Sequence, residues 1–218
     1  MERTFDRLTV WDFHGVLEVG SPEVVVEIIN VVLQRHGLAP TMTIGKCDAW
    51  YGLKLYALFA NLTPNLSHEH HLGFETDYRD LQAKRDIVLA KVRPAPHALA
   101  VLEAIAEAGQ QQILITNTSP GGIQLYLEAT GMTRYFRDGT LFPTNIRGAQ
   151  LTKKEVLGAY LKDKQFSLVS IVGDSPADMD LGDVVEGSKR LLLYTHPDKA
   201  PNQHPKARNI FDLRDVLV

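Results

Sequence analysis

The residues of this chain that could do chemistry stand at the ends of short apolar runs. Such runs are typical of buried strands in a parallel sheet, and open α/β sheets bind ligands at the carboxyl ends of their strands. We therefore expect the polar residues that end these runs to converge. In chain order they are Asp12, Thr116 with Asn117, and Asp174 with Asp178, and Lys153 or Lys154 opens a helical segment before the last pair.

This set of side chains suits phosphoryl transfer. A carboxylate such as Asp12 can act as a nucleophile and form an aspartyl-phosphate. A hard dication such as Mg²⁺ prefers oxygen ligands, so Asp12 could share the ion with Asp174 and Asp178. A lysine would neutralise further charge, and the Thr116 hydroxyl would hydrogen-bond a phosphoryl oxygen.

The elements that must position these residues follow from hydrophobic patterning. Alternation of apolar runs with amphipathic segments implies βαβ units and a three-layer, doubly wound parallel sheet of the α/β class. The expected strands are 8–13, 112–117, 167–174 and 190–195, and the expected helices are 95–110, 120–132 and 153–163.

Residues 18–92 break this alternation, because they show helical patterns and no convincing strand. A structureless loop of that length would be unusual in a compact domain. We expect helices over 21–37, 46–62 and 67–92. The predicted organisation is an α/β core of residues 1–17 and 93–218, with an inserted α-helical cap domain of residues 18–92.

Composition excludes several classes of protein. The chain has 218 residues, of which 44% are hydrophobic, and a net charge of −3, which argues against a nucleic-acid partner bound through phosphates. No run approaches the roughly 18 apolar residues of a membrane span. The single cysteine, Cys47, allows no intrachain disulfide, and no signal peptide is evident. We expect a cytoplasmic monomer or homodimer with no membrane partner.

Taken in order, four motifs resemble those of the haloacid dehalogenase-like hydrolases, and most closely their phosphoglycolate-phosphatase-like branch with a helical cap. The resemblance covers nearly the whole chain and a Rossmann-like core. The motifs are "DFHGVL" (12–17), Thr116 in "ILITNTS", a lysine in "TKKEVL", and "GDSPADMD" with Asp174 and Asp178.

The resemblance implies a role for each matching residue. Asp12 is the nucleophile and a ligand of Mg²⁺, Asp174 is a second ligand, and Asp178 binds or supports the metal. The backbone oxygen of His14 also binds the ion in this family. Thr116 and Lys153, with Lys154 as the alternative, hold the phosphoryl group of a small phosphorylated metabolite. Substrate contacts are also expected from Asn117 and Gly15.

His14 departs from the family pattern. The family has an aspartate there, which protonates the leaving group and then activates water. In one hypothesis His14 takes over this acid–base task, because an imidazole suits proton transfer near neutrality. In a second, the protein is an impaired hydrolase that still binds a phosphorylated ligand. In a third, it cleaves carbon–halogen or carbon–phosphorus bonds; the latter chemistry resembles a Schiff-base mechanism, for which Lys46 and Lys54 are the cap lysines.

Overall fold

A computed structural model describes residues 6–218 except 51–52, 54, 84, 147–150 and 197–198. The chain forms two compact units, Met1–Val19 with Arg93–Val218, and Gly20–Val92. The first boundary lies after Val19 rather than after residue 17. Its cause is a small antiparallel pair of strands, β2 (Glu18–Val19) and β3 (Arg93–Pro94), which keeps Glu18 and Val19 in the larger unit.

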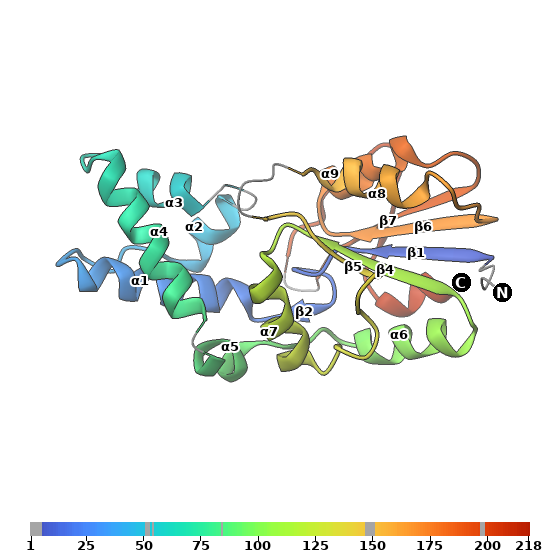
Figure 1. Ribbon diagram of the computed structural model, residues 1–218, viewed down its shortest axis with the longest axis horizontal. Coiled ribbons are helices and arrows are strands. Elements are labelled where there is room, and N and C mark those ends of the chain that lie inside the picture. Colours follow the sequence, from blue (N-terminus) through green and yellow to red (C-terminus); the bar gives the residue numbers. More distant parts are fainter. Residues whose placement is uncertain (1–5, 51–52, 54, 84, 147–150, 197–198) are drawn as a thin grey trace. The chain divides into compact units, whose positions relative to one another are not determined.

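The larger unit is built on a six-stranded sheet in the order β5-β4-β1-β6-β7-β8 (Figure 1). Every neighbouring pair in this sheet is parallel. The doubly wound parallel sheet predicted from the apolar runs is thereby confirmed. The strands are β1 (Arg7–Trp11), β4 (Gln111–Thr116), β5 (Leu141–Pro143), β6 (Leu168–Gly173), β7 (Lys189–Tyr194) and β8 (Arg208–Ile210).

Helices cover both faces of the sheet. Figure 1 shows α6 and α7 on one side, and α8 and α9 on the other. The buried apolar residues of β1, β4, β6 and β7 pack against Leu157 of α8 and Met179 of α9. The bounds are α6 (Ala98–Glu107), α7 (Pro120–Thr130), α8 (Lys153–Leu161) and α9 (Pro176–Met179), with 3-10 helices η1 (Asp180–Val184) and η2 (Leu213–Leu217).

Besides the short β2–β3 pair, two strands of the six-stranded sheet, β5 and β8, were not predicted. Each has three residues, β5 is only half-buried, and β8 is largely exposed, so neither gives a continuous apolar run. The expected strands end with 190–195, so β8, which begins at Arg208, is seen in the structure alone. The predicted central strands differ from the observed ones by one or two residues at each end.

The regular structure described within Gly20–Val92 is helical. It consists of α1 (Ser21–Arg35), α2 (Ile44–Ala49), α3 (Leu55–Leu62), α4 (His68–Gln82) and α5 (Arg85–Lys91). The helices expected over 46–62 and 67–92 are each two helices. The side chains of Phe59 and Phe74 are buried, and their ring centroids lie 5.2 Å apart in the core of this unit. No helix in the described part of the chain is long and apolar enough to cross a membrane.

Candidate active site

Asp12 lies at the carboxyl end of the central strand β1. Its backbone N–H donates to the Val172 carbonyl at 2.9 Å, so pairing with β6 continues through this residue. Only 8% of Asp12 is exposed. The fold therefore fixes a nearly buried carboxylate at the edge where parallel sheets bind ligands.

Lys153 is a cation in contact with two carboxylates of the site. Its Nζ lies 2.7 Å from Oδ1 of Asp12 and 2.7 Å from Oδ1 of Asp178. Thr152 and Glu155 form a capping box that begins α8 at Lys153, which explains why this lysine points from the first turn. Although burial favours its neutral form, the two carboxylates raise the pKa of Lys153.

The neighbouring Lys154 takes a different position. Its Nζ donates to Asp183 at 3.0 Å, in an exposed pair. The sequence did not decide whether Lys153 or Lys154 lies at the site. In the structure, Lys153 contacts Asp12.

Asp178 is held by the first turn of α9. Its Oδ2 accepts hydrogen bonds from the Ser175 backbone N–H at 3.2 Å and from the Ser175 hydroxyl at 2.6 Å. Close packing requires a glycine at position 173, since a Cβ there would lie 2.2 Å from Cβ of Asp178. Oδ2 of Asp178 thus accepts from Ser175 at the start of α9, and Oδ1 accepts from Lys153.

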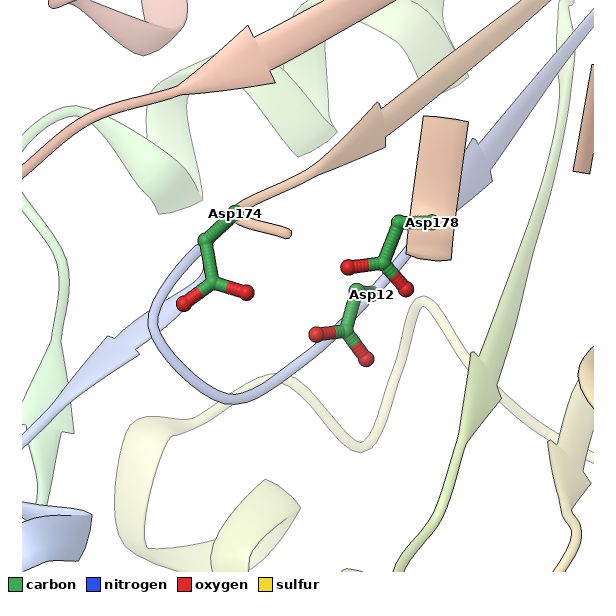
Figure 2. A group of neighbouring side chains, drawn as sticks. All are labelled: Asp12, Asp174 and Asp178. Carbon is green, nitrogen blue, oxygen red and sulfur yellow. The ribbon is translucent and has the colours of Figure 1, made fainter. Parts of the chain in front are cut away.

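Three carboxylates form a group that could hold a metal ion. Ligand atoms of Asp12, Asp174 and Asp178 all lie within 4.8 Å of one another, and Figure 2 shows the three side chains gathered around one region. Oδ1 of Asp174 is buried without a hydrogen-bond partner. An unpartnered buried carboxylate oxygen is costly unless a cation approaches it. These residues therefore fit a hard dication.

The electrostatics of the group agree with this fit. Burial, together with the charges of Asp12 and Asp178, raises the pKa of Asp174 from 3.8 to about 7. Burial also raises the pKa of Asp12, although Lys153 opposes the shift. Carboxylates that raise one another's pKa values repel each other when ionised, and a bound cation reduces this repulsion.

Gly15 forms the turn between Asp12 and the following segment. Its φ is +75°, and a Cβ at this position would lie 2.2 Å from Oδ2 of Asp174. A side chain would therefore intrude among the carboxylates. Asn202 supports the same region from a distant loop, because its Nδ2 donates to the Asp174 carbonyl at 2.8 Å.

The His14 side chain is held by two polar partners. Nδ1 lies 2.9 Å from Oε1 of Glu18, and Nε2 lies 2.8 Å from the Thr118 hydroxyl. Its ring stands edge-on to those of Phe13 and Tyr126, with centroids 5.2 and 4.8 Å away.

Thr116 ends the strand β4, and Asn117 follows it. Thr116 is fully buried, and its hydroxyl donates to the Thr118 hydroxyl at 3.1 Å. Thr118 thus joins the threonine of the second motif to His14. The Asn117 Oδ1 accepts from the Thr144 hydroxyl at 2.8 Å and so ties two loops together. Its expected contact with substrate stays a prediction.

Sequence reasoning missed several residues of the site. Glu18 and Thr118 were not singled out, although both partner His14. Glu18 lies four residues after His14, but the pair is not on a helix, so its spacing carried no signal. Ser175 is the N-cap of α9, because its side chain accepts from the Asp178 backbone N–H.

A parallel sheet that presents a buried carboxylate and lysine site at its carboxyl edge is the arrangement of an α/β enzyme. Residues 9–185 match the model of a family described as haloacid dehalogenase-like hydrolase, and the chain belongs to that family. The resemblance inferred from the four motifs is thereby confirmed. Among curated proteins, no sequence matches this chain.

Solved structures share the fold at low sequence identity. A predicted phosphoglycolate phosphatase from Haemophilus somnus 129PT is 17% identical, with a TM-score of 0.76 over 100% of this chain and 98% of that one. A family hydrolase from Deinococcus radiodurans R1, with bound phosphate and sodium, is 16% identical, with a TM-score of 0.65 over 98% and 93%. A family protein from Streptococcus pneumoniae is 18% identical, with a TM-score of 0.67 over 88% and 85%.

Proposed function

We propose that this protein is a phosphatase that hydrolyses a small phosphate monoester through an aspartyl-phosphate on Asp12. The observation that carries the proposal is the position of Lys153, whose Nζ lies 2.7 Å from both Asp12 and Asp178. Such a cation can neutralise a phosphoryl group at the nucleophile. A metal-free hydrolase of carbon–halogen bonds would not need the further carboxylates, Asp174 and Asp178.

Each residue has a defined task in this mechanism. An oxygen of Asp12 attacks phosphorus, and the bond from phosphorus to the leaving oxygen breaks. Lys153 moves from its carboxylate partners toward the phosphoryl oxygens, and Thr116 supplies a hydroxyl to one of them. Asp12, Asp174 and the backbone oxygen of His14 would hold Mg²⁺, with Asp178 as supporting residue. When bound, the ion would neutralise charge between phosphate and carboxylates.

His14 is the acid of this proposal. It protonates the leaving oxygen in the first step and takes a proton from water in the second, which are the tasks of the family's second aspartate. Its hydrogen bond to the Thr118 hydroxyl supports the proposal, because Thr118 in turn contacts Thr116. Nε2 is thus linked by two hydrogen bonds to the residue expected to bind the phosphoryl group.

The comparisons support the same class of substrate. The structurally similar hydrolase from Deinococcus radiodurans contains phosphate, and the similar Haemophilus somnus protein is described as a predicted phosphoglycolate phosphatase. We take the substrate to be a small phosphorylated metabolite. The cytoplasmic location, the monomeric or homodimeric state and the lack of nucleic-acid or membrane partners stay predictions.

Carbon–phosphorus cleavage has little support. It would require a cap lysine as Schiff base, but Nζ of Lys46 donates to the Thr41 carbonyl at 2.8 Å. Lys54 lies outside the described residues.

The test is hydrolysis of p-nitrophenyl phosphate by the purified protein, with and without Mg²⁺, from about pH 5 to 9 around the ordinary histidine pKa. The blank is Asp12→Asn, which keeps the shape of the side chain and removes the nucleophile. We expect turnover that needs Mg²⁺ and vanishes in the blank. Activity equal to the blank at every pH would contradict the proposal.

The impaired-hydrolase hypothesis is tested with His14→Asp. If the histidine is the only defect of a phosphate-binding protein, this replacement should raise turnover by about 10²-fold or more, the usual contribution of an acid–base group. If His14 is a working acid, His14→Ala should instead lose a similar factor on an alkyl phosphate such as glycerol phosphate, whose leaving oxygen needs a proton.

A further inference from the structure

Glu18 has no assigned role, yet its carboxylate touches the residue that sets this chain apart from its family. We propose that Glu18 is the positioning residue of the acid: it holds His14 through Nδ1, so that Nε2 is directed to Thr118 and the phosphoryl site. This inference rests on the proposed function. It adds a carboxylate–imidazole–hydroxyl array, Glu18–His14–Thr118, to the motifs that the sequence showed.

Glu18 is rigidly placed. Its side chain is 0% exposed. Its backbone pairs with Pro94 in the β2–β3 ladder and forms a β-bridge with His14. The neighbouring Leu17 carbonyl accepts from the Ala95 N–H at 2.9 Å. The paired backbone fixes the position of Glu18, and full burial of the side chain restricts the carboxylate beside the imidazole.

The imidazole is fixed as well. The edge-on contacts with Phe13 and Tyr126 restrict rotation of the ring. Oε1 of Glu18 lies 2.9 Å from Nδ1 of His14, and in our proposal Nδ1 donates its hydrogen to this oxygen. The other nitrogen, Nε2, is then the atom that gains and loses the catalytic proton. A carboxylate that fixes the tautomer and the orientation of a catalytic histidine in this way increases the rate of the reaction.

Thr118 holds Nε2 when no substrate is bound, at a distance of 2.8 Å. In the first step the leaving oxygen replaces the Thr118 hydroxyl as the partner of Nε2. The bond from phosphorus to that oxygen breaks, its electron pair stays on the oxygen, and the proton from Nε2 joins it. The imidazole is left neutral, with its Nδ1–H still donated to Glu18. In the second step Nε2 takes a proton from the water whose oxygen attacks phosphorus. The bond from phosphorus to the Asp12 oxygen breaks, which releases phosphate and restores the Asp12 carboxylate.

A merely structural role for the Glu18–His14 contact predicts different behaviour. Loss of stability or of site geometry would slow the reaction of every substrate alike. Loss of a positioned acid slows only those substrates whose leaving group needs a proton. Aryl phosphates release a stable phenolate, whereas alkyl phosphates release a strongly basic alkoxide, so the ratio of the two rates distinguishes the roles.

The experiment compares kcat/KM for p-nitrophenyl phosphate and for glycerol phosphate in wild type, Glu18→Gln and Glu18→Ala. We expect Glu18→Ala to lose about 10²-fold on the alkyl substrate and much less on the aryl substrate. Glu18→Gln, whose amide oxygen can still accept from Nδ1, should retain part of the alkyl activity. In a His14→Ala background, Glu18→Ala should leave the substrate ratio unchanged, because Glu18 acts through the imidazole.

A spectrum of the imidazole gives a second measurement that needs no turnover. With ¹⁵N-labelled histidine, the Nδ1 resonance of His14 should be that of a protonated, hydrogen-bonded nitrogen in wild type and should change in Glu18→Ala. Asp77→Ala is the matched control, since Asp77 accepts from Nε2 of His36 at 2.7 Å on an exposed surface. This control should alter the His36 signal alone.

Equal losses on both substrates in Glu18→Ala, or a shift of the ratio that persists in the His14→Ala background, would overturn the inference. An unchanged His14 spectrum in Glu18→Ala would also overturn it. If wild type hydrolysed neither substrate, the proposed phosphatase function would fail, and the spectrum would still decide whether Glu18 positions the ring.

Discussion

Nζ of Lys153 lies 2.7 Å from an oxygen of Asp12, a residue 141 positions earlier in the chain. The contact joins the start of α8 to the end of β1, and the same ammonium reaches Asp178. One cation therefore serves two buried carboxylates. Removing either partner leaves an uncompensated charge, so the contact bears on both turnover and stability.

Replacement of Lys153 by alanine should reduce kcat/KM for p-nitrophenyl phosphate by at least about 10²-fold, because the phosphoryl charge loses its counter-cation. It should also destabilise the metal-free protein by about 3 kcal/mol, because Asp12 and Asp178 lose their shared partner. Steady-state kinetics and urea denaturation measure the two effects. Lys154→Ala is the control, since that side chain pairs only with the exposed Asp183 among described contacts. A loss of activity in Lys154→Ala as large as that in Lys153→Ala would contradict the assignment.

The raised pKa of Asp174 predicts a pH-dependent effect of Asp174→Asn. The folded-state pKa is about 7, against an ordinary value of 3.8. The folded protein therefore keeps a proton that the unfolded chain releases, and this contribution to stability is lost as the pH rises through 7. With EDTA present, Asp174→Asn should be more stable than wild type above that pH, by on the order of 2–4 kcal/mol.

At about pH 4, near the ordinary aspartate pKa, the advantage of Asp174→Asn should largely disappear, because Asp174 is then protonated in the folded protein. Urea denaturation at both pH values is the measurement. A stability difference independent of pH would show that the pKa of Asp174 is not raised in the folded protein.

Mg²⁺ should stabilise the wild-type protein. A ligand that binds only the folded state adds about 2.7 kcal/mol at a concentration 100 times its dissociation constant. Thermal unfolding with increasing Mg²⁺ should therefore give a rising Tm, and EDTA should reverse the rise. The increase should be absent in Asp174→Asn, which lacks one ligand. An equal rise in that variant would place the ion elsewhere.

Gly15→Ala should impair both metal binding and turnover. The new Cβ would lie 2.2 Å from Oδ2 of Asp174, in a backbone conformation with φ of +75°. Gly139→Ala is the matched control, because Gly139 has a φ of +81° and no atom within 4 Å of its ideal Cβ. Both variants should lose roughly 1 kcal/mol from left-handed backbone strain.

Only Gly15→Ala should lose the stabilisation by Mg²⁺ and most of the hydrolysis of p-nitrophenyl phosphate. Thermal unfolding with and without Mg²⁺, together with kcat/KM, separates the two variants. If both variants kept full activity, the close approach of Gly15 to Asp174 would not matter for the reaction.

The central sheet could be predicted because its strands are buried on both faces. β1, β4, β6 and β7 are largely buried, and each contains several apolar residues close together, which the sequence displays directly. The short strands β5 and β8 owe their conformation to the neighbour that they pair with. Such pairing leaves no local pattern, which is why neither strand was predicted.

The site divides in the same way. The positions of Asp12, Thr116 and Asp174 follow from the strands that they end, so the sequence brought them to one edge of the sheet. The choice of Lys153 over Lys154 could not be made from sequence, because both begin the same helix. The structure decides it: with α8 packed on the core through Leu157, Lys153 contacts Asp12 and Lys154 contacts the exposed Asp183.

The sequence by itself determined the α/β class, the family, the order of the four motifs and the unusual histidine, since these depend on residue types and local periodicity. Only the tertiary structure decided what surrounds that histidine. Thr118 lies 104 positions from His14, and Glu18 reaches it because β2 pairs with β3 across the inserted segment. Contacts between residues so far apart, or across an irregular turn, arise from the packing of whole elements, which no short stretch of sequence encodes.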